Sequence, residues 1–152
     1  MHLEFFTLFL LSNDINAQND VSVDSTKVHH IIIKLFDGMR EGDSAKVASV
    51  FKKNVRMLSF SSKKTGESVL YEGKLSDFLI AIGSPHEEIW DEKIWDTEIQ
   101  IDGNLAQIWT QYGFYIGEKF SHCGVDAFQL VKENEQWKII NLMDTRRVKG
   151  CK

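Results

Sequence analysis

Hydrophobic residues in the first third of the chain recur with the spacing of an α-helix. Over residues 25–41 the apolar side chains stand three or four positions apart and share one helix face: Val28, Ile31, Ile32, Leu35, Phe36 and Met39. Asp24 or Ser25 is expected to cap the start of this helix, and Gly42 is expected to end it.

Two shorter helices are predicted after the first. Asp43 is expected to cap a helix over residues 44–51, whose residues Val47, Val50 and Phe51 would point inward. A third helix is predicted over residues 74–82, where apolar residues again share one side.

The second half of the chain changes to a pattern typical of long β-strands. Asp102-Gly103 is a strong hairpin signal, and β-branched and aromatic residues dominate four segments: 89–101, 105–116, 121–132 and 137–147. Shorter strands are predicted over residues 55–61 and 68–72. Helices followed by an antiparallel meander predict an α+β fold, with the helices packed on one face of a curved sheet.

Length and charge narrow the class of protein. The chain has 152 residues, of which 43% are hydrophobic and 26% are charged. These values fit one globular domain, which we place at residues 25–148 with a tail over 149–152. The net charge of −4 argues against binding to nucleic acid, which needs a basic face.

An apolar run near the start resembles a secretory signal peptide. Residues 3–11 are mostly apolar, and a small residue, Ala17, stands at a plausible cleavage position. We predict a leader over residues 1–17 and a periplasmic or secreted protein, cytoplasmic if the leader is not functional. The alternative is an apolar arm that packs on the domain. The run is too short to span a membrane.

The two cysteines, Cys123 and Cys151, fit no metal-binding spacing. They could pair in an exported protein. We favour the alternative of two unpaired thiols, with Cys123 buried on a strand and Cys151 on a frayed end. Carboxylates follow His86 at Glu87 and Glu88, but this spacing suits no zinc motif, and no metal or cofactor is expected.

Particular segments resemble a known family. They are FDGMREGD at 36–43, GSPHEEIWDE at 83–92, and the stretches 101–131 and 137–147. They are similar to exported bacterial lumazine-binding proteins of the nuclear transport factor 2-like superfamily, which includes ketosteroid isomerase and SnoaL-like cyclases. The resemblance implies a cone-shaped, cystatin-like fold, in which a strongly curved antiparallel sheet wraps around the first helix and leaves a pocket at its wide end.

His122 and Asp126 are the candidate catalytic residues, because they stand four apart on one strand and face the same side. A turn at residues 118–119 would place His122 opposite Tyr115 and Asp126 opposite Gln111. His122 could then act as a general base with Tyr115 as its orienter, and Gly124 would leave room on that face. The alternative is a polar residue near a strand end, solvated or bonded to backbone.

Aromatic and polar side chains are the candidate pocket lining. Asp144 and Arg146 share one face of the last strand, where Arg146 could hold an anionic or carbonyl group; alternatively the pair closes the sheet edge. Aromatic residues make up 11% of the chain and could stack a planar ligand, or form core and a dimer face. The predicted lining is Phe36, Met39, Phe60, Trp90, Trp109, Tyr112, Tyr115, Asp144 and Arg146.

Three functions follow from these expectations. The first is an exported domain that binds a small molecule in an aromatic, hydrophobic pocket. The second is a cofactor-independent isomerase, dehydratase or cyclase that uses His122 or Asp126. The third is a homodimeric interaction module that uses the outer face of the sheet. Sequence motifs of serine hydrolases, phosphate-binding loops and zinc proteases do not occur.

Overall fold

The computed structural model of the protein describes residues 11–63 and 65–152, with side chains from residue 21 onward. The leader predicted over residues 1–17 begins outside the described residues and stays a prediction. No helix in these two ranges has the length and apolar character needed to cross a membrane. The elements are α1 (Leu11–Glu41), α2 (Ser44–Ala48), β1 (Phe51–Ser62), β2 (Ser68–Gly73), α3 (Leu75–Gly83), β3 (Trp90–Asp102), β4 (Leu105–Ile116), β5 (Lys119–Glu133) and β6 (Gln136–Arg146).

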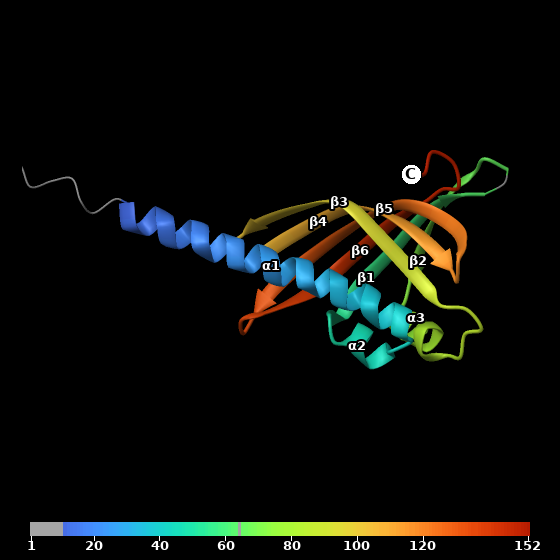
Figure 1. The fold of residues 1–152 in the computed structure, drawn as a ribbon, viewed down its shortest axis with the longest axis horizontal. Helices are drawn as coiled ribbons and strands as arrows, with labels where there is room; N and C mark the ends of the chain where they lie inside the picture. The colour runs from blue at the N-terminus through green and yellow to red at the C-terminus, as the bar shows by residue number, and fades with distance from the viewer. Residues whose placement is uncertain (1–10, 64) are drawn as a thin grey trace, which may run out of the picture.

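A single curved sheet covers one side of the long helix α1 (Figure 1). The strand order is β2-β1-β6-β5-β4-β3, and every neighbouring pair is antiparallel except β1 and β6, which are parallel. Bulges interrupt the pairing, and one in β3 between Trp95 and Glu98 holds Asp96 at a φ of 51°. Because bulges increase local twist, they let the sheet bend around the helix. The predicted α+β fold is confirmed.

Helix α1 begins earlier than its apolar stripe indicates. Its first residue is Leu11, so the predicted start at residue 25 and the predicted cap at Asp24 or Ser25 are wrong. No Pro or Gly stands between residues 11 and 25 to end a helix. Asp24 has a different role: its buried carboxylate accepts hydrogen bonds from Lys132 Nζ at 2.7 Å and Trp137 Nε1 at 3.2 Å.

The predicted stripe of α1 forms the core with the inner face of the sheet. Val28, Ile32 and Leu35 are almost fully buried, and Gly42 ends the helix with a φ of 67°. The strands contribute every second residue to the same core. These sheet residues are Ala106, Ile108, Phe128, Leu130, Trp137 and Ile139.

The chain between α2 and β1 departs from the predicted helix over residues 44–51. Asp43 caps α2 as predicted, accepting a hydrogen bond from Lys46 N at 2.8 Å, but the helix ends at Ala48. Ile139 N donates to Val50 O at 2.9 Å, which ties the segment to β6. Pairing with the sheet therefore replaces the last predicted helical turn, and β1 starts at Phe51.

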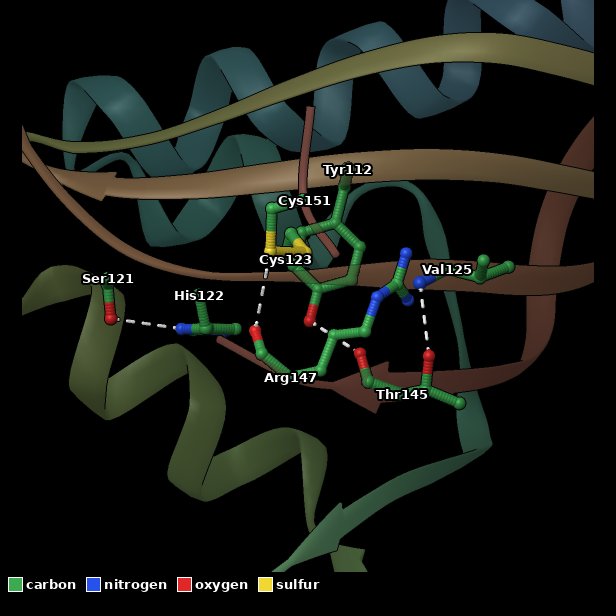
Figure 2. Close-up of a disulfide and its surroundings, with 8 residues drawn as sticks. All are labelled: Tyr112, Ser121, His122, Cys123, Val125, Thr145, Arg147 and Cys151. Carbon is green, nitrogen blue, oxygen red and sulfur yellow. Dashed lines mark hydrogen bonds between the residues drawn. A yellow bond between two sulfur atoms is a disulfide. The ribbon is translucent and has the colours of Figure 1, made fainter. Parts of the chain in front are cut away.

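Cys123 and Cys151 form a disulfide, so the preference for unpaired thiols was wrong. Arg147 continues the antiparallel pairing of β6 with β5, since the backbones of Cys123 and Arg147 exchange two hydrogen bonds of 2.9 Å. The chain then bends over residues 148–150, and Cys151 reaches Cys123 (Figure 2). This path brings the two cysteine Cα atoms to 5.9 Å, within the range that a disulfide spans. The expected tail over residues 149–152 is thus anchored to the sheet at Cys151.

Candidate functional site

A cavity of about 450 Å³ opens between α1 and the concave face of the sheet. Leu35, Phe36 and Met39 come from the last turns of α1, where the buried stripe of the helix borders the cavity. Strands β3 to β6 supply the facing wall with Trp90, Phe114, Phe128 and Leu142. Two pairs of these rings pack edge to face. The ring centroids of Phe36 and Phe128 are 6.3 Å apart, and those of Trp90 and Phe114 are 6.1 Å apart.

Two acidic side chains, Glu92 of β3 and Asp126 of β5, face this cavity and lie close enough to affect each other's pKa. Two carboxylates that lie close together repel each other, so the pair favours a state in which one of them carries a proton. Burial raises the pKa of Asp126 well above its usual range, and the nearby Glu92 charge raises it further. Burial raises the pKa of Glu92 to about 7. The pair therefore retains a proton at pH values at which an ordinary carboxyl group has lost it.

His122 lies on the same face of β5 as Asp126. Its Nδ1 is 3.0 Å from Ser121 Oγ, and its ring packs against Phe114 and Tyr112 with centroids 5.1 Å and 5.7 Å apart (Figure 2). Burial lowers the pKa of His122, and the positive charge of Arg146 lowers it further. The imidazole is therefore neutral at neutral pH and retains one ring nitrogen that can accept a proton.

Tyr112 connects the cavity to the end of β6. Its hydroxyl donates to Thr145 O at 2.8 Å and lies 3.2 Å from Asp144 Oδ2, which also accepts from Arg146 Nε at 2.8 Å (Figure 2 shows Tyr112 and Thr145). Burial raises the pKa of Tyr112, and the Asp144 charge raises it further, so the phenol stays protonated. Asp144 thus holds Arg146 beside the cavity. The Tyr112 hydroxyl lies between the Asp144 carboxylate and the backbone oxygen of Thr145.

Gly124 allows the close contact between Tyr112 and β6, because the backbone of β6 lies where the Cβ of any other residue would be. A Cβ at this position would lie 1.7 Å from Thr145 O and 2.8 Å from Tyr112 Cε1. The Thr145 hydroxyl in turn accepts a hydrogen bond from Val125 N at 3.1 Å (Figure 2). The expectation that Gly124 leaves room for a ligand was therefore wrong, because backbone and the Tyr112 ring occupy that space.

The structure places most of the predicted site residues along the cavity. The polar members gather at one end, where His122 and Asp126 approach from β5 and Asp144 and Arg146 from β6. Their functional roles stay predictions. The predicted residues that line the cavity are Phe36, Met39, Trp90, Tyr112, His122, Asp126, Asp144 and Arg146.

Tyr115 does not line the cavity, because strand alternation turns its neighbours Phe114 and Ile116 toward it. Tyr115 points to the convex face, where its ring centroid is 5.7 Å from that of Phe120. The register also differs from the predicted one by one residue, since His122 pairs with Phe114 and Asp126 with Thr110. The predicted pairs of His122 with Tyr115 and of Asp126 with Gln111 were wrong, and Tyr115 cannot orient His122.

Trp109 and Phe60 also lie away from the cavity. Strand alternation turns Ile108 and Thr110 inward, so Trp109 faces outward and is 54% exposed. Phe60 pairs with Leu70 toward the end of the β1–β2 hairpin and is not among the residues that line the cavity. The homodimer predicted through the outer sheet face stays a prediction.

Glu92 is the acidic side chain beside Asp126 in the cavity that the sequence predictions did not include. It stands between Trp90 and Ile94 on one face of β3, so a single charge interrupts an inward apolar series. That interruption was the available signal. Across the described ranges, no group of three or more His, Cys, Asp or Glu side chains is placed to hold a metal ion.

Comparison with known proteins agrees with the architecture. The sequence profile of the family described as "Putative lumazine-binding" matches residues 23–143. A comparison with curated protein sequences gave no match.

Solved structures share the fold at low sequence identity. An NTF2-like protein with a cystatin-like fold from Novosphingobium aromaticivorans has a TM-score of 0.74 and 8% identity, covering 95% of this chain and 94% of its own. A structure titled a putative dehydratase from the NTF2-like family, from Streptomyces avermitilis, has a TM-score of 0.62 and 11% identity, covering 84% and 98%. A Mycobacterium tuberculosis protein of unknown function has a TM-score of 0.69 and 13% identity, covering 85% and 75%.

Proposed function

This chain belongs to the putative lumazine-binding family, and we propose that its cavity binds a ring-containing small molecule. The observation that carries the proposal is a cavity of about 450 Å³ with an apolar, aromatic wall and one polar end. Binding pockets of this size commonly combine hydrophobic lining with a few polar groups that fix the ligand's orientation. The rings of Phe36, Phe114 and Phe128 would contact the flat body of the ligand, and the polar end would contact its heteroatoms.

Filling the cavity is expected to abolish ligand binding. Leu142→Trp places a larger side chain in the wall, whereas Leu105→Trp makes the same change at an exposed position of β4. Lumazine and naphthalene derivatives are suitable probes, and a ligand at 100 times its Kd should stabilise the wild type by about 2.7 kcal/mol. We expect Leu142→Trp to weaken binding at least about tenfold, and Leu105→Trp to leave it unchanged.

Thermal unfolding with and without each probe, followed by isothermal titration calorimetry, measures this effect. The proposal fails if no planar probe stabilises the wild type. It also fails if the Leu142→Trp protein binds as tightly as the Leu105→Trp protein.

A second candidate function, proton transfer on a bound substrate, is favoured by one observation. The neutral His122 ring faces the cavity that the protonated Asp126 also lines, so a base and an acid are available together. His122 would remove a proton from a carbon beside a carbonyl group. In D₂O, deuterium exchange into a bound ketone that His122→Gln abolishes would support this function. Exchange that persists unchanged in the variant would exclude His122 as the base.

A further inference from the structure

The Glu92–Asp126 pair is an unusual end for an apolar cavity, because burying a carboxyl group is unfavourable unless it is paired. Asp126 is only 4% exposed, and its Oδ2 atom is buried and accepts no hydrogen bond from any residue in the described ranges. The same side chain lines the cavity. Asp126 therefore brings to the cavity a carboxyl group with one oxygen whose hydrogen-bonding capacity no described residue fills.

The charges nearest to the pair are offset by neighbouring partners. Asp144 and Arg146 approach from β6 and largely offset each other, since their side chains form an ion pair of 2.8 Å. Asp91 lies next to Glu92 on β3, and its carboxylate forms an ion pair of 2.8 Å with Arg40. His122 and Tyr112 are neutral. The remaining charged residues of the cavity lining come from β2 and the start of α3 and are Glu72, Lys74 and Asp77.

We propose that the Glu92–Asp126 pair binds the protonated amine of an aromatic ligand. The inference rests on the proposed function and specifies the ligand class for the same cavity. The ammonium group would lie between the two carboxyl groups and donate hydrogen bonds to both, including the Asp126 oxygen that now accepts none.

Exchange of a proton for the ammonium explains why an amine fits better than other groups. Above the pKa of Glu92, the raised pKa of Asp126 leaves one proton and one negative charge on the pair. When a protonated amine enters, this proton leaves, so the site keeps the same net charge and gains a cation with several donors. A carboxylate ligand would meet a second carboxylate. A neutral carbonyl could accept only from the protonated carboxyl group and would leave the charged one without a cation.

Aromatic rings next to the pair favour the same ligand class. Tyr112, Phe114 and Trp90 line the cavity together with Glu92 and Asp126. Ring faces attract cations, and this attraction is stronger where water is excluded. An ammonium group joined to a flat ring system therefore matches both the charged end and the apolar wall of the cavity.

Three probes that share one ring system test the proposal on the unaltered protein. They are naphthylmethylamine, naphthylmethanol and naphthoate, which carry a cation, a neutral group and an anion. Calorimetry is performed at a pH about one unit above the pKa of Glu92, in two buffers that differ in ionisation enthalpy. We expect the amine to bind at least about tenfold more tightly than the alcohol, with release of about one proton per amine bound.

Isosteric variants show whether Glu92 and Asp126 are the residues that bind the amine. Glu92→Gln and Asp126→Asn are each expected to weaken amine binding at least about tenfold and to leave the alcohol within about twofold. Glu98→Gln, at an exposed position of the same strand, is the matched control and should change neither affinity. Thermal unfolding verifies that each variant is folded.

The outcomes separate this inference from the proposed function. If the alcohol or the naphthoate binds and the amine does not, the inference is overturned and ligand binding stands. Amine binding without proton release, or with equal affinity in Glu92→Gln and Asp126→Asn, also overturns it. If none of the three probes binds, both proposals fail.

Discussion

Gly124→Ala is expected to lower the free energy of unfolding by at least about 3 kcal/mol. The added Cβ would lie 1.7 Å from Thr145 O, a backbone atom that cannot move without displacing β6. Separation of β5 from β6 would weaken the hydrogen bonds from the Tyr112 hydroxyl to Thr145 O and from Val125 N to Thr145 Oγ1. Overpacking and lost hydrogen bonds therefore act together at this position.

Urea-induced unfolding followed by tryptophan fluorescence measures this loss. Gly73→Ala is the matched control, because its added Cβ would have Met57 Cβ as nearest neighbour at 3.9 Å, an ordinary contact. We expect that control to stay within about 1 kcal/mol of the wild type. A Gly124→Ala protein as stable as the Gly73→Ala protein would show that β6 does not pass so close to Gly124.

Cys151→Ser is expected to lower the free energy of unfolding by about 3 to 4 kcal/mol. The disulfide joins residues 28 positions apart, and closing a loop of that length restricts the unfolded chain by about this amount in the chain-entropy model. Cys123, which is 1% exposed, keeps its buried position in the variant, so the change removes the cross-link with little effect on packing.

A reducing agent provides the control for this second prediction. It should lower the stability of the wild type to that of Cys151→Ser and leave the variant unaffected, as measured by urea-induced unfolding. A difference below about 1 kcal/mol between the two proteins would contradict the prediction. Because disulfides persist in oxidising compartments, the Cys123–Cys151 bond also supports our proposal that the protein is periplasmic or secreted.

Local sequence patterns predicted most of the fold, because each depends on residues close together in the chain. The helical stripe that includes Ile32 and Leu35, the capping residue Asp43 and the hairpin after Asp102 all lie where the sequence places them. The early start of α1 was missed because residues 11–24 carry no apolar stripe. That segment contains no residue that would end a helix, but it also lacks the apolar spacing from which a helix is predicted.

The candidate site was harder to predict, because it depends on sheet register and on chain path. The register of β4 against β5 differs from the predicted one by one residue, so His122 lies opposite Phe114, and the expected partner Tyr115 points outward by strand alternation. Glu92 was overlooked because its partner, Asp126, is 34 positions away and meets it only through folding. The disulfide was missed for the same reason, since it depends on the pairing of β6 with β5 and on the bend after Arg147 that brings Cys151 to Cys123.

A crystal structure of the protein grown with naphthylmethylamine tests the central claim most directly. We predict ring density inside the cavity against Phe36 and Phe114, with the amine nitrogen within hydrogen-bonding distance of carboxyl oxygens of Glu92 and Asp126. Density confined to the outer sheet face around Trp109, or a cavity without ligand at saturating probe, would contradict the claim that this cavity is the binding site.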